Sequence, residues 1–396
     1  NACEREYNYC GHSDLLRRPF FGSGGALFTP LILRRLSAVM AEAQSDRMIY
    51  TQSIKVGSTY KNPWGDGDIP SKRAAIYFLT ESNLSNVPGE EELNKTLPVH
   101  KLCPEVSRPP DKGIRITWIG HASVLVQFDG YSILADPIFS YRCSPLSFAG
   151  PKRYRPSPCT VDELPNIDAV CISHNHYDHL DVQTVQDLNV RFPNINWFVP
   201  AGLKDWMSQT GVTKNVSEYE WWGEKEISKT ANDKTTIMKF VFTPTKHWCN
   251  RGVFDRNRVL WGSWTMIGPR YRVYFGGDTA YCKGFKEIGH KYGPFDLAAI
   301  PIGAYEPRVP SILLKTMEKQ HVNPEEAVKI HQDVKAKKSL GIHWGTFVLT
   351  YEYYLDPPKK LKEALLAAGI PEEDFFTLDH GESRLIIPDP EMTPRL

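Results

Sequence analysis

The chain has 396 residues, of which 41% are hydrophobic, and a formal net charge of +1 at pH 7. It is long enough to bury a sizeable core, whereas the near-neutral charge argues against an enzyme that holds nucleic acid through a broad basic field. Eight cysteines are scattered without a Cys-x-x-Cys pair, so the sequence predicts neither a thiolate zinc site nor a disulfide scaffold.

The first part of the chain differs from the rest. Residues 1–50 are expected to form a tail that is disordered or lies on a membrane surface, because their apolar stretch at 20–33 is too short to cross a bilayer. A signal peptide is the alternative for this tail. Residues 51–110 are expected to form an arm. Its amphipathic stretch at 71–79 fits either a membrane interface or an ordinary helix packed on the core.

Strand signals become dense from residue 114 onward. Short runs rich in β-branched and aromatic residues, separated by turn formers, predict strands at 114–118, 123–128, 132–135, 169–172 and 197–200. A helical pattern follows at 181–188. Two strand-rich halves with intervening helices favour an α/β fold, in which helices cover the outer faces of two sheets.

A dense group of metal-binding residue types follows the predicted strand at 169–172. The string is His174-Asn175-His176-Tyr177-Asp178-His179. Side chains alternate on an extended strand end, so His174 and His176 point the same way, and Asp178 and His179 follow at the turn. Imidazoles and a carboxylate without thiolates suit zinc or a similar transition metal in a catalytic site. A histidine-rich surface turn is the alternative, which the position at a strand end disfavours.

Three later residues obey the same rule of placement. His247, Asp278 and His343 each end a short apolar run and are followed by a turn or a small residue. Ligand sites in open α/β folds form at the carboxyl ends of strands, so these residues are expected to join the string in one dinuclear site. Asp136 also follows a predicted strand. It fits either a turn-forming Asp-Pro pair or a partner of the ligands.

The His-x-His-x-Asp-His string, with its later His, Asp and His, resembles the metallo-β-lactamase superfamily. Flanking stretches are similar to one family within it, the N-acyl phosphatidylethanolamine-hydrolysing phospholipases D. They include 117–122, 150–154, 261–264, 293–308 and 343–347. The resemblance runs from about residue 61 to about residue 384. It implies an αββα sandwich of two mixed β-sheets with helices on the outer faces, and a catalytic domain at 111–390.

The resemblance also implies a role for individual residues. His174, His176 and His247 are expected to bind one zinc ion. Asp178, His179 and His343 are expected to bind a second, and Asp278 is expected to bridge the two ions. The catalytic residues are expected to be Asp178, Asp278 and His321, and the substrate contacts Tyr177, Gln320 and His321. Asp136 is expected to hydrogen-bond near the metals, and His121 to be a structural or supporting residue rather than a ligand. The charge pattern, rather than the resemblance, predicts a solvated loop at the basic run 152–155, and contact with anionic lipid head groups is the alternative.

The implied activity is that of a zinc-dependent phospholipase D with two Zn²⁺ per chain. A hydroxide bridging the metals would attack the phosphodiester phosphorus of N-acyl phosphatidylethanolamine, releasing N-acylethanolamine and phosphatidic acid. The family further implies a homodimer, peripheral on the cytosolic face of intracellular membranes such as Golgi or endosomes, with a membrane phospholipid substrate and no nucleic acid partner. The alternatives are another hydrolase of this fold (a lactonase, thioesterase or nuclease) and a non-catalytic lipid-binding protein.

Overall fold

The computed structural model describes residues 49–65, 86–231, 233–308 and 317–388. The chain divides into two compact units, residues 1–49 and 50–396, and every described helix and strand belongs to the second. The expected tail lies outside the described residues except for its last two, and the amphipathic stretch at 71–79 lies outside them entirely. None of the described helices combines the length and the apolar character needed to cross a bilayer.

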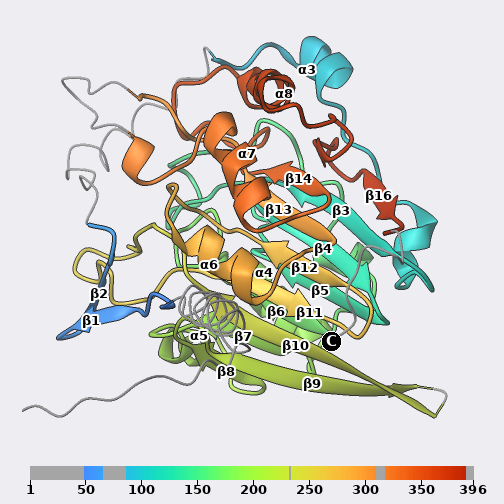
Figure 1. The fold of residues 1–396 in the computed structure, drawn as a ribbon, viewed down its shortest axis with the longest axis vertical. Coiled ribbons are helices and arrows are strands. Elements are labelled where there is room, and N and C mark those ends of the chain that lie inside the picture. Colours follow the sequence, from blue (N-terminus) through green and yellow to red (C-terminus); the bar gives the residue numbers. More distant parts are fainter. Residues whose placement is uncertain (1–48, 66–85, 232, 309–316, 389–396) are drawn as a thin grey trace, which may run out of the picture. The chain divides into compact units, whose positions relative to one another are not determined.

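One seven-stranded sheet has the order β16-β3-β4-β5-β6-β7-β8 (Figure 1). Its strands are β3 (Ile114–Gly120), β4 (Ser123–Phe128), β5 (Tyr131–Ala135), β6 (Ala169–Cys171), β7 (Asn196–Pro200), β8 (Val216–Tyr219) and β16 (Ser383–Ile386). Neighbours pair antiparallel from β16 to β5 and parallel from β5 to β8. The helices α4 (Val182–Arg191) and α5 (Lys204–Gln209) connect the parallel neighbours β6, β7 and β8.

A second seven-stranded sheet has the order β15-β14-β13-β12-β11-β10-β9. Its strands are β9 (Glu224–Ala231), β10 (Lys234–Thr243), β11 (Ser263–Ile267), β12 (Arg272–Phe275), β13 (Leu297–Pro301), β14 (Ser339–Ile342) and β15 (Phe375–Phe376). Neighbours pair parallel from β15 to β12 and antiparallel from β12 to β9. The parallel strands are joined by α6 (Gly284–Lys291), α7 (Pro324–Asp333) and α8 (Asp356–Ala368). The two sheets therefore share one pattern of pairing, although the edge strand β16 of the first sheet comes from the end of the chain.

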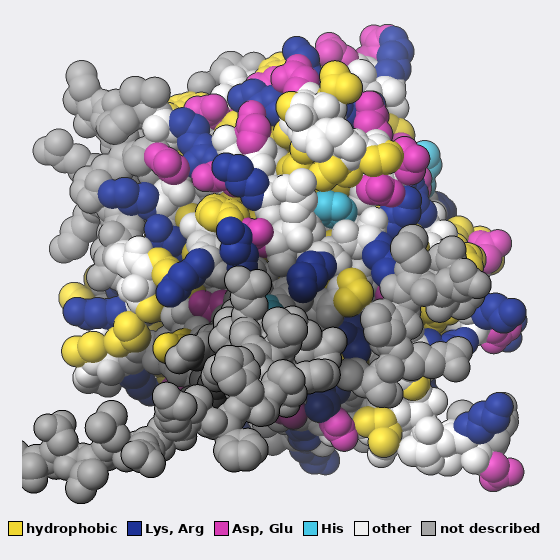
Figure 2. Space-filling model, viewed as in Figure 1, with side chains coloured by type: hydrophobic (Ala, Val, Ile, Leu, Met, Phe, Trp, Pro, Cys, Tyr) yellow, Lys and Arg dark blue, Asp and Glu magenta, His cyan; other side chains and the backbone are white. Residues whose placement is uncertain are grey.

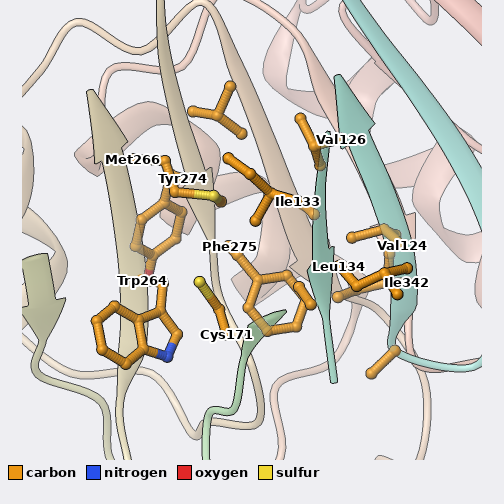
Figure 3. Packing of buried hydrophobic residues seen from close by; sticks show 14 of the residues in the cluster. Val124, Val126, Ile133, Leu134, Cys171, Trp264, Met266, Tyr274, Phe275 and Ile342 are labelled. Carbon is orange, nitrogen blue, oxygen red and sulfur yellow. The ribbon is translucent and has the colours of Figure 1, made fainter. Parts of the chain in front are cut away.

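The main hydrophobic core joins the facing sides of the two sheets. Figure 3 shows residues of β4, β5 and β6, such as Val124, Ile133 and Cys171, beside Trp264 of β11 and Phe275 of β12. Every residue of β4, β5 and β6 is buried, because such strands are covered on both faces and lose the alternation of a half-exposed strand. The predicted sandwich of two mixed sheets is confirmed, and the predicted strands agree within about two residues.

Local sequence fixes the start of α7, which follows directly on the candidate residues Gln320 and His321. Asn323 Oδ1 accepts a hydrogen bond from the Glu326 amide at 2.9 Å, and the Glu326 carboxylate accepts one from the Asn323 amide at 3.2 Å. This reciprocal pair, with Pro324 in the first turn, satisfies amides that would otherwise lack partners. α7 packs on β13, with α6 and α8 beside it (Figure 1). The other helices among the described residues are α3 (Glu90–Thr96) and the 3₁₀ turns Pro104–Ser107, Val161–Glu163 and Met317–Lys319.

The described segment 50–65 lies against the second half of the fold. It forms the hairpin β1 (Ile54–Val56) and β2 (Thr59–Lys61). The Trp64 ring then stacks on Trp221 with a centroid separation of 5.6 Å. The Asn62 side chain donates to the carbonyl of the candidate ligand His247 at 2.8 Å. This segment therefore reaches the loop that carries a candidate ligand.

The prediction of a solvated loop at 152–155 is wrong. Arg153 and Arg155 are buried. The Arg153 guanidinium donates to the carbonyls of Ile138 and Ser140 and lies 5.1 Å from the centre of the Phe347 ring. Carbonyl acceptors and an aromatic face replace the water that a guanidinium otherwise needs, so a basic run can be buried here.

Candidate metal centre

The structure brings all seven predicted ligands together at the ends of strands from both sheets. The string 174–179 follows β6, and His247, Asp278 and His343 follow β10, β12 and β14. Two backbone hydrogen bonds join the halves here, from the Gly262 amide to the Ser173 carbonyl and from the His343 amide to the His121 carbonyl. The sheets thus meet at the site. Strand ends, rather than long flexible loops, position its side chains.

One group consists of His174, His176, His247 and Asp278. His176 Nδ1 lies 2.9 Å from His174 Nε2 and 3.2 Å from His247 Nε2. Burial lowers the pKa of all three imidazoles, that of His176 to about 3 and that of His247 to about 4. The three rings are therefore neutral, and their nitrogens converge on one point. A divalent cation at this point would satisfy the lone pairs together.

A second group contains Asp178, His179 and His343. Asp178 Oδ2 lies 3.4 Å from both His179 Nε2 and His343 Nε2. Asp278 completes the arrangement, with Oδ2 3.1 Å from His179 Nε2 and Oδ1 3.0 Å from His343 Nε2. Since Asp278 Oδ2 also lies 3.7 Å from His247 Nε2, its carboxylate spans the two groups.

Charge at the second group favours cation binding. Burial raises the pKa of Asp178 and Asp278, but the surrounding imidazoles outweigh it and hold both pKa values well below the ordinary range. The same carboxylates raise the pKa of His343 to about 9, against the effect of burial. Among the described residues, His179 Nε2, His343 Nε2 and Asp278 Oδ1 are buried and make no hydrogen bond of good geometry, although the last two atoms lie 3.0 Å apart. These are the atoms that a metal ion would contact in place of protons, so the residues fit a metal centre.

Asp136 supports ligands of both groups. One of its oxygens accepts from the Ser173 amide at 2.7 Å, and the other lies 2.7 Å from His179 Nδ1. The Ser173 hydroxyl donates to the same carboxylate and therefore accepts from His174 Nδ1–H at 2.8 Å. With Nδ1 engaged in this way, the Nε2 lone pairs of His174 and His179 face the metal groups. One buried carboxylate thus fixes an imidazole in each group.

His121 lies closer to the ligands than the sequence indicates. Burial lowers its pKa to about 3, and neutral His121 donates Nε2–H to Asp178 Oδ2 at 2.9 Å. His121, Asp136 and His343 all have positive φ angles, of 54°, 40° and 65°. Non-glycine residues rarely adopt this region, and the surrounding contacts must hold them there. Sequence patterns carry no signal for this strain at three positions of one site.

The predicted substrate contacts differ in their surroundings. His321 is buried, with Nδ1 3.9 Å from Asp278 Oδ2 and its ring stacked 5.2 Å from that of His343. The Gln320 carbonyl accepts a hydrogen bond from His247 Nδ1–H at 3.0 Å. The Gln320 side-chain oxygen accepts from Trp248 Nε1–H at 2.7 Å, so this amide already has a partner within the chain.

Tyr177 lies at the edge of the site beside Arg251, a residue that the sequence analysis missed. The Tyr177 hydroxyl donates to the Arg251 carbonyl at 3.0 Å, and the Arg251 guanidinium lies 4.0 Å from the centre of the Tyr177 ring. The guanidinium also donates to the carbonyls of Leu180 at 2.6 Å and Asn175 at 3.2 Å. Arg251 therefore contacts the backbone near the start of the ligand string and just after its end. Ser173 could have been suspected because it adjoins the string, whereas nothing in the sequence marks Arg251.

Comparisons with known proteins agree with this geometry. A family model described as "Beta-lactamase superfamily domain" matches residues 131–344. The chain is 42% identical over 346 residues to the N-acyl-phosphatidylethanolamine-hydrolyzing phospholipase D 1 of Caenorhabditis elegans, covering 84% of this chain and 94% of that protein. It is 31% identical over 322 residues to the mitochondrial N-acyl-phosphatidylethanolamine-hydrolyzing phospholipase D of Saccharomyces cerevisiae, covering 72% of this chain and 66% of that protein.

Solved structures show the same fold at low sequence identity. One is "a possible metal-dependent hydrolase" from Veillonella parvula, with a TM-score of 0.51 and 16% identity, covering 69% of this chain and 100% of that one. Another is CmlA, a diiron β-hydroxylase from Streptomyces venezuelae, with a TM-score of 0.50 and 16% identity, covering 71% of this chain and 55% of that one.

Proposed function

Because this chain belongs to the metallo-β-lactamase superfamily and, within it, to the family of N-acyl phosphatidylethanolamine-hydrolysing phospholipases D, we propose that it hydrolyses N-acyl phosphatidylethanolamine to N-acylethanolamine and phosphatidic acid. Membership makes it a metal-dependent phosphodiester hydrolase. The observation that carries the specific substrate is the 42% identity to the nematode enzyme over 84% of this chain. The two convergent groups of donor atoms provide the chemistry that such a reaction needs.

We propose two zinc ions as the resident metals. His174, His176 and His247 would hold one ion, Asp178, His179 and His343 the other, and Asp278 both. When bound, such a pair of ions lowers the pKa of coordinated water to near neutrality and stabilises negative charge on phosphoryl oxygens. Imidazole and carboxylate donors without thiolates are typical of catalytic rather than structural zinc.

The chain's own residues arrange the reactants. In the proposed reaction a water oxygen bonds to phosphorus, the bond from phosphorus to the N-acylethanolamine oxygen breaks, and a proton ends on that leaving oxygen. Burial keeps the pKa of His321 well below its usual value, and its Nδ1 has no hydrogen-bond partner among the described residues. A neutral imidazole at this position can donate a hydrogen bond to a phosphoryl oxygen. Asp136 and Ser173 keep the ligand imidazoles in one tautomer throughout.

The setting of the reaction follows from the substrate. A phospholipid with long acyl chains is held in a bilayer, so we propose peripheral membrane association. The homodimer and the cytosolic face of Golgi or endosomal membranes remain predictions from the resemblance.

Site variants with two separate readouts test this proposal. His176→Ala and Asp278→Asn should abolish turnover of N-acyl phosphatidylethanolamine in mixed micelles and lower the zinc content of the purified protein. His321→Gln should reduce turnover while zinc stays bound. His331→Gln is the matched control, because His331 is a buried histidine that bonds to Ser339, outside the ligand groups. Full turnover by the Asp278 variant with unchanged zinc would refute the site.

A further inference from the structure

Two loops beside Tyr177 expose large apolar side chains. The first loop spans residues 140–155 and the second residues 249–258. Their exposed apolar side chains, with the exposed fraction of each, are Tyr141 (60%), Leu146 (40%), Phe148 (77%), Val253 (83%) and Phe254 (85%). Burying such side chains in water-free surroundings is favourable, and single exposed ones are common. Their concentration on two loops at one position in the fold is what requires an explanation.

Contacts within the chain place both loops next to the same side chain. The Tyr177 hydroxyl donates a hydrogen bond to the carbonyl of Arg251, which belongs to the second loop. The Tyr177 ring packs against a small buried cluster that contains Cys143 of the first loop. Tyr177 itself stands between the candidate ligands His176 and Asp178 in the sequence. The two loops that carry the exposed apolar side chains therefore both lie beside Tyr177, which adjoins the candidate ligands in the sequence.

The two loops also carry an excess of positive charge. They contain seven Lys or Arg residues and a single acidic residue, Asp255, whereas the whole chain balances 47 basic against 46 acidic residues. The Asp255 carboxylate accepts hydrogen bonds from the Arg251 amide. Arg153 and Arg155 are buried, but Arg142, Lys152, Arg251, Arg256 and Arg258 are at least partly exposed. Figure 2 shows acidic and basic side chains intermixed on one face of the molecule.

We propose that these two loops form a docking surface for an anionic lipid bilayer, with Phe148, Val253 and Phe254 entering the interfacial layer. Apolar tips with basic residues behind them match a bilayer whose acyl region lies beneath anionic headgroups. Docking in this orientation brings the edge of the metal centre, at Tyr177, onto the lipid surface. This inference rests on the proposed function, because it explains how a bilayer-resident phosphodiester reaches the ligands.

The test is binding of the zinc-loaded protein, with all 396 residues, to vesicles without substrate. The vesicles contain phosphatidylcholine alone or phosphatidylcholine with phosphatidylserine, and bound protein is measured by co-sedimentation. The double variant Phe148→Ser/Phe254→Ser should partition onto the anionic vesicles at least about tenfold more weakly, since each ring loses its apolar contact. The matched control is Val190→Ser/Leu366→Ser, which removes two equally exposed apolar side chains, 81% and 83%, from α4 and α8. Its binding should not change.

Turnover separates this inference from the proposed function. The Phe148/Phe254 variant should keep wild-type turnover of substrate dispersed as detergent-solubilised monomers and lose turnover of substrate held in vesicles. Wild-type vesicle binding by this variant overturns the docking surface even if the phospholipase activity is present. A change in self-association without a change in vesicle binding also overturns it and makes the surface an interface between copies of the chain. Vesicle binding that depends on the two phenylalanines, in a protein that leaves the lipid intact, supports the surface and refutes the proposed substrate.

Discussion

Replacing Asp136 by asparagine tests how the two ligand groups are held together. Asp136 is fully buried, and its carboxylate accepts hydrogen bonds from the Ser173 amide, the Ser173 hydroxyl and His179 Nδ1–H. Asparagine has nearly the same shape, but its Nδ2 donates hydrogen bonds and cannot accept one. At least one of these donors therefore loses its acceptor, while the volume of the site is unchanged.

The expected effect can be sized from these contacts. Removing the carboxylate that orients a metal-binding imidazole typically lowers metal affinity about 10- to 100-fold, which is about 1.4–2.8 kcal/mol. Because Asp136 contacts His179 directly and His174 through Ser173, we expect binding at both groups to weaken. The donor left without an acceptor should lower the free energy of unfolding of the metal-free protein by a further ~1–3 kcal/mol.

Competition against a chromogenic zinc chelator measures the first effect, and urea unfolding with excess chelator measures the second. Asp168→Asn is the matched control. Asp168 also accepts from a backbone amide, that of Ser132 at 2.9 Å, and pairs with Lys229, away from the ligands. It should lose stability without losing zinc affinity. Unchanged zinc affinity in the Asp136 variant would show that the observed hydrogen bonds do not position the ligands.

Three further predictions follow from other contacts. Gly277→Ala should abolish zinc binding, because Gly277 has a φ of 58° and an added Cβ would lie 2.6 Å from Ser173 Cβ; zinc content that equals wild type would contradict this. Burial lowers the pKa of His331 from 6.5 to about 4, so the unfolded chain binds a proton that the native chain does not. Above pH 6.5 His331 is neutral in both states and does not reduce the free energy of unfolding. As the pH falls from 6.5 to about 4, protonation of the unfolded chain lowers that free energy by about 3 kcal/mol. His331→Gln should therefore flatten the dependence of the urea midpoint on pH in this window, and an unchanged slope would exclude His331 as its source. Chelation should lower the thermal midpoint of the wild type, and zinc added in excess over the chelator should restore it. Identical melting curves with and without chelator would indicate that no metal binds the native fold.

The fold and the ligand positions could be predicted because their signals are local. Apolar runs bounded by turn formers predicted the strands at 114–118 and 123–128, and strand-end placement brought His247 and Asp278 into the same site as the string at 174–179. The helix start at Asn323 is equally local, since its capping pattern lies within four residues.

The rest depends on contacts between distant parts of the chain. Arg251 donates to the carbonyls of Asn175 and Leu180, some seventy residues earlier, and no pattern in the sequence around Arg251 predicts these contacts. The donation from His121 to Asp178 joins β3 to the string after β6, and only the paired sheets bring them together. The prediction for Arg153 was wrong because local charge does not reveal the carbonyls and the Phe347 ring that cover its guanidinium.

The most direct test of the central claim is to follow the oxygen of water through the reaction. Zinc-loaded protein is incubated with N-acyl phosphatidylethanolamine in mixed micelles made with water labelled with heavy oxygen, and the products are identified by mass. Attack at phosphorus predicts one labelled oxygen in phosphatidic acid and none in the N-acylethanolamine, with both products lost on chelation. Label in a released fatty acid, or intact lipid in the presence of two bound zinc ions, would contradict the account.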